Sequence, residues 1–234
     1  MSTSDTHVAS GRPYRGSSPD QRKEDRREKL LDAAVEIFGT TGYRTASIDR
    51  ICATAGLTKR YFYESFSGSE DLLVAVYRRA TATMLAGVTA PTDDAVSKDE
   101  LSDNAASDAP ASAETVLRAA LSNFFRTLAD DPRSARIVLL EVLGVSSEVD
   151  ALYRQTISQF VDAVLALADS VGTAHGLAGP NRRTLAVGLV GAVLMMTQQW
   201  LLAPEADTAR AESLDAVITG AHTILGAVAF GRLD

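Results

Sequence analysis

The sequence has little of what several common protein classes depend on. Its single cysteine excludes an intramolecular disulfide framework, and no Cys and His residues have the spacing of a zinc site. With 7 Pro and 16 Gly among 234 residues, the composition is not that of a fibrous or turn-rich protein. A nucleophile elbow, a phosphate-binding loop and a metal signature are also missing, so we expect no enzyme, metal or cofactor. The first 20 residues lack the apolar stretch of a signal peptide, which favours a cytoplasmic location.

The charge of the chain is unevenly distributed. The formal net charge is −7, which by itself argues against binding to nucleic acid. Residues 1–89 nevertheless carry 13 Lys and Arg against 11 Asp and Glu, a net charge of +2, whereas residues 90–234 carry 10 against 19, a net charge of −9. A basic N-terminal part on an acidic body would turn its basic end toward phosphates.

The segment from Ser47 to Phe66 has the pattern of two short helices joined by a tight turn. Apolar residues fall on one face of the first helix, and Gly56 follows where a left-handed residue is expected to end it. Ser47 and Thr58 precede the two helices as expected N-caps. In the second helix Phe62 and Phe66 lie one turn apart and are expected to face inward. The remaining face is basic and aromatic, as in the second helix of a helix-turn-helix: Lys59, Arg60, Tyr61 and Tyr63.

Helical periodicity covers most of the remaining chain and predicts an all-α protein. A disordered arm over residues 1–21 precedes the helices; its Arg12 and Arg15 could enter a minor groove, although an untethered tail is the alternative. Residues 90–112 are acidic and low in complexity, which predicts a flexible loop. The expected helices run from about residue 22 to Gly39 or Gly42, from a Ser69 cap to Val88, and over 113–129, 133–145, 148–171, 181–203 and 208–231.

The last two expected helices have unusual compositions. Residues 184–203 contain no charge, so a membrane span has to be weighed, but the polar Gln198 and Gln199 and the acidic segment that follows favour a buried helix. Both helices carry small residues, including Gly188, Gly191 and Gly220, which permit close helix approach. We expect them to form half of an intersubunit four-helix bundle and thus a homodimer, with ordinary packing within one chain as the alternative.

A linked set of segments between Lys29 and Tyr77 resembles the tetracycline-repressor (TetR) family of bacterial transcription regulators. The set consists of KLLDAAVEIFGTTGYRTASI, DRICATAGLTKRYFYESF and SEDLLVAVY. The resemblance implies an all-α fold, with an N-terminal three-helix helix-turn-helix head (residues 22–89 with its connecting fourth helix) and a larger helical ligand-binding and dimerisation body (residues 113–234). Cys52 replaces the usual Ala and is expected to be a small buried residue, with a redox role as the alternative.

The resemblance also implies which residues bind a double-stranded DNA operator. Ala46 and Ser69 depart from the family pattern, and the absence of the usual Lys at position 69 should remove one phosphate contact. Arg60 could donate a bidentate contact to guanine O6 and N7, and a phosphate contact is nearly as plausible. The DNA-binding residues implied in this way are Ser47, Thr58, Lys59, Arg60, Tyr61 and Tyr63.

The body is expected to hold a small-molecule effector, whose identity the sequence does not give. Glu141 is unusual in an apolar segment, and either pairs with an arginine such as Arg136 or Arg154 or faces the cavity. For each other candidate, plain core packing is the alternative. The candidate pocket residues are Phe124, Phe125, Leu128, Glu141, Tyr153, Phe160, Met195, Met196, Gln199 and Trp200.

The function predicted from the sequence is a repressor that binds a palindromic operator as a homodimer and is released by a small, largely apolar ligand. In such a protein the ligand must bind the two states of the repressor with different affinity. The alternative is a ligand-independent helical DNA-binding protein without a sensing pocket. A cavity in the body would favour the regulator.

Overall fold

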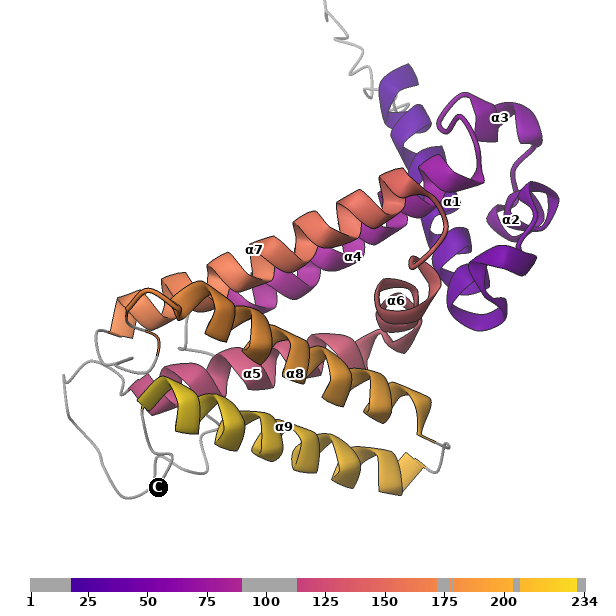
Figure 1. Cartoon of the computed structure of the whole chain (residues 1–234). Helices are drawn as coiled ribbons and strands as arrows, with labels where there is room; N and C mark the ends of the chain where they lie inside the picture. Colours follow the sequence, from indigo (N-terminus) through magenta and orange to yellow (C-terminus); the bar gives the residue numbers. More distant parts are fainter. Residues whose placement is uncertain (1–17, 90–112, 172–176, 178, 204–206, 231–234) are drawn as a thin grey trace, which may run out of the picture.

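The computed structural model describes residues 18–89, 113–171, 177, 179–203 and 207–230, and the regular structure within them is helical throughout (Figure 1). The predicted all-α fold is thereby confirmed. Residues 1–17 of the expected arm, with Arg12 and Arg15, and the expected acidic loop over residues 90–112 lie outside the described residues.

The head is built from α1 (Pro19–Thr41), α2 (Ile48–Ala55) and α3 (Lys59–Tyr63). The first helix begins at Pro19, three residues before the expected start, because the Ser18 hydroxyl accepts a hydrogen bond from the Gln21 N–H at 3.0 Å and proline suits a first helical turn. The helices enclose a closely packed core, in which Leu30, Phe38, Ile51 and Phe62 are fully buried.

The turn between α2 and α3 has the geometry expected from its sequence. The Ser47 hydroxyl accepts the Arg50 N–H at 3.3 Å and caps α2, and Gly56 ends the helix in the left-handed region with φ 65°. The Thr58 backbone is extended at the N-cap position of α3, but its hydroxyl makes no capping hydrogen bond, so that part of the prediction was wrong. The Thr58 carbonyl instead accepts from Tyr61 and Phe62.

The connecting helix α4 (Ser69–Thr89) starts differently from the prediction. Ser69 is its first helical residue and not its cap. The start is closed by Asp71, whose carboxylate accepts the N–H of Ser67 at 2.9 Å and its hydroxyl at 3.2 Å. This carboxylate reaches back to a donor that precedes the helix, in the manner of the second half of a capping box.

The body consists of α5 (Ala113–Asp130), α6 (Pro132–Arg136), α7 (Ser147–Val171), α8 (Arg182–Leu202) and α9 (Asp207–Phe230). The single helix expected over residues 133–145 is wrong in its details: α6 continues into a π-helical turn, Ile137–Glu141, and then leaves the helical path. A contact from another helix stabilises this turn: the Gln198 side chain on α8 donates a hydrogen bond to the Leu139 carbonyl at 3.1 Å. Helix α7 is capped by Ser146, whose hydroxyl accepts from the Val149 N–H.

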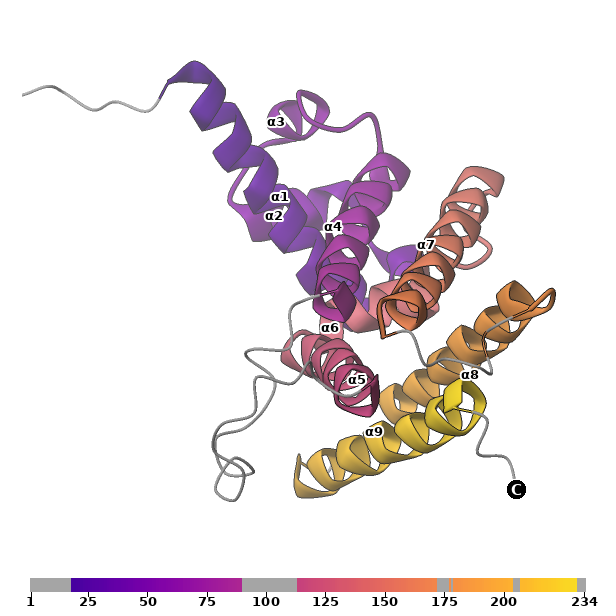
Figure 2. The same ribbon diagram turned by 90° about the vertical axis from the view of Figure 1, so that its left-hand side faces the viewer.

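Helix α4 connects the two parts of the molecule. In both views it runs beside α7 from the head into the body (Figures 1 and 2). Its first turns bury Leu72 and Val76 in the head, while Met84 packs farther along, and one hydrophobic core continues from the head into the body. The head is thus anchored to the body by shared packing.

Helices α8 and α9 lie side by side on the side of the body away from the head (Figure 2). Within the described part of the chain α8 is the one helix long and apolar enough to cross a membrane, yet only 28% of its most apolar window is buried. Only part of α8 is therefore buried, in contrast to the buried helix predicted from the sequence. Trp200 and Thr197 face the core, whereas Leu185, Val187 and Met195 are exposed.

Candidate DNA-binding surface and ligand pocket

The residues expected to contact DNA are all exposed, either on α3 or at the N-cap positions of α2 and α3. Tyr63 is 58% exposed and Tyr61 36% exposed, although large aromatic side chains are usually buried in a folded protein. The Tyr63 ring is supported from beneath by an edge-to-face contact with the buried Phe62, at 5.3 Å between ring centroids. The remaining members of the exposed set are Ser47, Thr58, Lys59 and Arg60.

The cations of this surface are held by neighbouring carboxylates. The Lys59 ammonium lies 2.8 Å from the Asp49 carboxylate on α2, and this hydrogen bond raises the pKa of Lys59. The Arg60 Nε donates to Glu64 Oε1 at 3.1 Å. The other Glu64 oxygen lies 3.8 Å from Nη2 of Arg26 on α1. The cations that the sequence places on this face therefore form ion pairs with neighbouring carboxylates.

Cys52 lies in the core of the head, where it is 4% exposed. Burial raises the pKa of its thiol, which keeps it protonated, and the nearby Asp49 acts in the same direction. These observations support its expected place as a small packing residue and count against the redox alternative.

Glu141 joins the body to the head and does not line the pocket to which it was assigned. Its Oε2 accepts the Tyr43 backbone N–H at 2.9 Å, across 98 residues of sequence, and its Oε1 lies 3.3 Å from Arg136 Nε. The site depends on Gly42, which has φ 88° and lets the carboxylate approach closely. The pairing with an arginine is confirmed with Arg136, and the placement in the cavity is wrong.

Further polar contacts connect the head to the body beside Glu141, and together with it they form the joint between the two regions. The Ser146 hydroxyl, before α7, donates to the Glu70 carboxylate on α4 at 2.6 Å. Arg133 on α6 forms an ion pair with Glu36 on α1 at 2.8 Å. Gly39 allows these two helices to touch, since a Cβ there would lie 2.5 Å from the Arg133 Cβ. The orientation of the head is thus specified by directional contacts in addition to the shared core.

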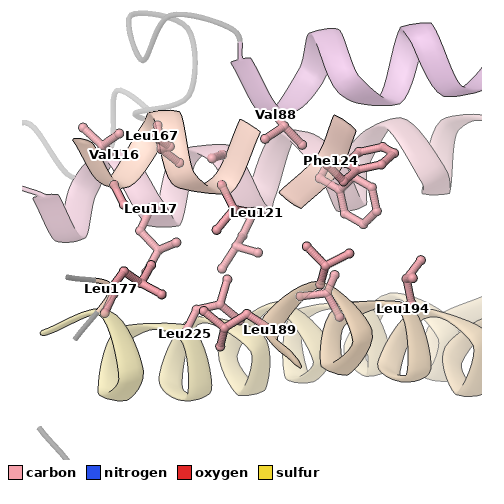
Figure 3. Close-up of a pocket in the computed structure, with 17 residues that line it drawn as sticks. Val88, Val116, Leu117, Leu121, Phe124, Leu167, Leu177, Leu189, Leu194 and Leu225 are labelled. Atoms are coloured by element: carbon pink, nitrogen blue, oxygen red, sulfur yellow. The ribbon is translucent and has the colours of Figure 1, made fainter. Parts of the chain in front are cut away.

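The body contains an apolar cavity of about 100 Å³ between α5, α7, α8 and α9, with Val88 from the last turn of α4 in its wall. Figure 3 shows Leu177 and Val116 toward one end of the cavity, and Phe124 and Leu194 toward the other. Its walls contain only Val, Leu, Ala and Phe: Val88, Val116, Leu117, Ala120, Leu121, Phe124, Phe160, Val164, Leu167, Ala168, Leu177, Leu189, Val190, Val193, Leu194, Leu225 and Ala229. Such walls suit an apolar ligand and offer no side-chain hydrogen bond.

Of the ten residues expected in the pocket, Phe124 and Phe160 line this cavity. Their rings are in edge-to-face contact at 6.0 Å between centroids. Phe125 and Leu128 point into the solid core with no exposure, and Met195 is 57% exposed on the outer face of α8. The others that do not line the cavity are Glu141, Tyr153, Met196, Gln199 and Trp200.

The aliphatic residues that form most of the wall were not singled out from the sequence. On α5 they are two pairs, Val116 with Leu117 and Ala120 with Leu121. The pairs lie one helical turn apart, and Phe124 follows one turn later. Their spacing is visible in the sequence, but the same spacing describes residues that pack against a solid core. The sequence alone therefore does not distinguish the residues of a cavity wall from those of a solid core.

These features define a class of protein: a helix-turn-helix head that presents exposed aromatic and basic residues, joined through one helix to a helical body with an apolar cavity. The sequence model of the TetR family of bacterial regulatory proteins matches residues 30–76, which lie in the head and the first turns of α4. The protein is therefore a DNA-binding transcription regulator of the ligand-responsive type.

Relatives extend the similarity beyond the head. The chain is 29% identical over 192 residues to the HTH-type transcriptional activator FasR of Mycolicibacterium smegmatis, covering 81% of this chain and 80% of that protein. It is 22% identical to the fatty acid metabolism regulator protein of Bacillus subtilis, over 76% of this chain and 81% of the relative. The structure of the transcriptional regulator FadR from Bacillus subtilis in complex with stearoyl-CoA has the same fold, with a TM-score of 0.64, 18% identity and coverage of 87% and 98%.

Proposed function

We propose that this regulator binds a palindromic operator as a homodimer and that a long acyl chain in the body cavity sets its affinity for DNA. The observation that carries the ligand class is the cavity wall, which contains only aliphatic and Phe side chains. Relatives with fatty acid metabolism in their names, and one that was solved with stearoyl-CoA, support the same class. The cavity also argues against a ligand-independent DNA-binding protein, for which a solid core is expected.

The coupling from ligand to DNA would pass through α4. Val88 at its C-terminal end contributes to the cavity wall, and Leu72 near its N-terminal end is buried in the head. The space beside Gly87 is tight, because a Cβ there would lie 3.0 Å from the Thr127 hydroxyl on α5. A ligand that displaces Val88 would therefore shift α4 as a whole and move the head, provided that it binds the two positions of α4 with different affinity.

A homodimer through α8 and α9 is supported by apolar side chains and glycines that are exposed on the outer face of α8. Val187 is 48% exposed and Leu202 58% exposed. A Cβ on Gly188 or Gly191 would meet nothing within 4 Å, so the small residues of α8 do not serve packing within the chain. They would allow the same two helices of a second copy to approach closely. The change Val187→Glu should give a monomer by light scattering and abolish operator binding, whereas a dimeric Val187→Glu protein would contradict this interface.

The ligand proposal is tested with a variant that fills the cavity. Ala168 lines the cavity on α7, and Ala166 is exposed two residues before it on the same helix. Acyl-CoA thioesters of increasing chain length, free fatty acids and free CoA are titrated into each protein in calorimetry and in a DNA-release assay. We expect Ala168→Phe to weaken acyl binding by at least about tenfold, as a loss of about 1.4 kcal/mol implies, and the matched control Ala166→Phe to bind as wild type. Equal binding by both variants, or binding of none of these compounds by wild type, would reject the proposal.

The direction of regulation is tested separately. The sequence predicts a repressor, but FasR of Mycolicibacterium smegmatis is named an activator. Run-off transcription from a promoter that carries the selected operator, with and without the protein, distinguishes the two. We place the protein in the cytoplasm because its DNA target lies there.

A further inference from the structure

Arg60 and Lys59 lie side by side on α3, but their carboxylate partners hold them in different ways. The single ammonium group of Lys59 lies 2.8 Å from the Asp49 carboxylate. Arg60 is held at Nε, by Glu64 at 3.1 Å, and its two Nη groups have no hydrogen-bond or ion-pair partner among the described residues. A guanidinium fixed at Nε keeps a two-nitrogen fork, which is the part that matches guanine O6 and N7.

Glu64 is itself positioned by the rest of the head. It follows α3 directly, and its backbone N–H bonds to the Arg60 carbonyl at 3.0 Å. Its second carboxylate oxygen lies 3.8 Å from Arg26 on α1, and the Arg26 guanidinium lies 4.6 Å from the centroid of the Tyr61 ring. Helix α1, Arg26, Glu64 and Arg60 therefore form a continuous series of contacts from the core of the head to its exposed surface.

We infer that Glu64 is a positioning residue that presents Arg60 as a base-reading side chain. The Arg60 side chain is 85% exposed, and a long flexible side chain at such a position would otherwise sample many rotamers and reach phosphates as easily as bases. Restriction by Glu64 lowers the loss of conformational entropy when Arg60 binds a guanine in the major groove. The carboxylate also repels phosphates, which disfavours the sequence-independent contact.

The carboxylates of Asp49 and Glu64 both pair with a cation of α3, but their roles differ. Asp49 neutralises a point charge that has no fixed direction, so its removal should strengthen binding to all sequences alike. Glu64 orients a planar donor, so its removal should strengthen binding to random DNA while weakening the preference for one base pair in each half-site. The inference rests on the operator binding proposed above.

The experiment begins with selection of an operator from random duplexes by the full-length wild-type protein. Dissociation constants are then measured for that operator, for a duplex in which the Arg60-dependent guanine is replaced, and for a random duplex. The proteins compared are wild type, Glu64→Ala, Glu64→Gln, the matched control Asp49→Ala, Arg60→Ala and the double variant Glu64→Ala with Arg60→Ala. Circular dichroism verifies that each variant is folded.

We expect wild type to prefer its guanine by about tenfold to a hundredfold, the usual range for a bidentate arginine contact. Glu64→Ala should lose most of this preference, and Glu64→Gln, which keeps an acceptor oxygen, should retain part of it. Asp49→Ala should keep the full preference while binding random DNA more tightly. In the double variant, loss of Glu64 should have no further effect on discrimination, as is required if it acts through Arg60.

Two results would overturn the inference while leaving operator binding intact. One is an unchanged base preference in Arg60→Ala, which would make Arg60 a phosphate contact. The other is an equal shift on all three duplexes by Glu64→Ala and Asp49→Ala, which would reduce Glu64 to a negative charge. A wild-type protein that selects no sequence overturns both the operator proposal and this inference.

Discussion

The head and the body are built from the same kinds of side chains at the same helical spacing, yet one is solid and the other is hollow. In the head, Phe38, Phe62 and Leu72 are fully buried in one core. In the body, Leu117, Phe124 and Leu189 border a cavity of about 100 Å³. The difference lies in how many helices meet and how closely they approach, which periodicity alone does not encode. A solid core holds a surface rigid for DNA, whereas a hollow one can accept a ligand.

The largest expected effect is the loss of a head aromatic. Phe62→Ala should lower the free energy of unfolding by about 3–5 kcal/mol, because a fully buried ring is removed from a well-packed site. The adjacent Tyr63→Ala is the control: its ring is 58% exposed, and we expect a change within about 0.5 kcal/mol. Urea denaturation at a fixed protein concentration measures both. Similar losses in the two variants would mean that the head is not the solid unit described.

The next effect compares overpacking in the two regions. Ala34 in the head has no exposed surface, so Ala34→Phe should destabilise the protein by at least about 1–3 kcal/mol. Ala168→Phe enters existing space in the body and should change stability by less than about 1 kcal/mol. The ratio of the two changes, from the same denaturation experiment, measures how much free space the body contains. A severe loss for Ala168→Phe would indicate that the cavity closes in solution.

The joint between the two regions is tested at Glu141. Glu141→Ala leaves the Tyr43 N–H and the Arg136 guanidinium without this carboxylate, and we expect a loss of about 1–3 kcal/mol. Glu24→Ala is the matched control, since the Glu24 side chain is 59% exposed and its ion pair with Arg27 is long, at 4.0 Å. Hydrogen exchange should show faster opening around Tyr43 in the first variant only. Unchanged exchange there would place the joint elsewhere.

The smallest effect is a pH dependence that arises on α4, where the two regions meet. Burial raises the pKa of Tyr77 from 10.0 to about 12. The folded state therefore holds the phenol proton more tightly than the unfolded state. The corresponding stability is fully present below pH 10 and is lost as the pH rises from 10 toward 12, with a slope of up to about 1.4 kcal/mol per pH unit.

Tyr77→Phe should remove this component of the slope between pH 10 and 11, where other groups titrate in both proteins alike. Tyr61→Phe, which removes a phenol on the surface of the head, provides the control. Denaturation at a series of pH values gives the comparison. Identical slopes for Tyr77→Phe and wild type would show that the phenol is hydrated in solution.

The sequence predicted the head better than the body, and the reason is physical. Ser47, Gly56 and Phe62 act through local backbone geometry and through packing between neighbours in sequence, which spacing encodes. The role of Glu141 depends on Tyr43, 98 residues away, and no local pattern contains such a contact. The cavity wall could not be separated from core for the same reason, because a void is a property of several helices together.

The sharing of α4 has a practical consequence for protein engineering. A chimaera that joins the head of one regulator to the body of another needs a junction between the two. Here Leu72 and Val76 belong to the packing of the head, Val88 belongs to the cavity wall, and fewer than five helical turns separate the first of these residues from the last. A junction within α4 therefore breaks native packing on one side or the other, unless the residues that face α4 are transferred with it.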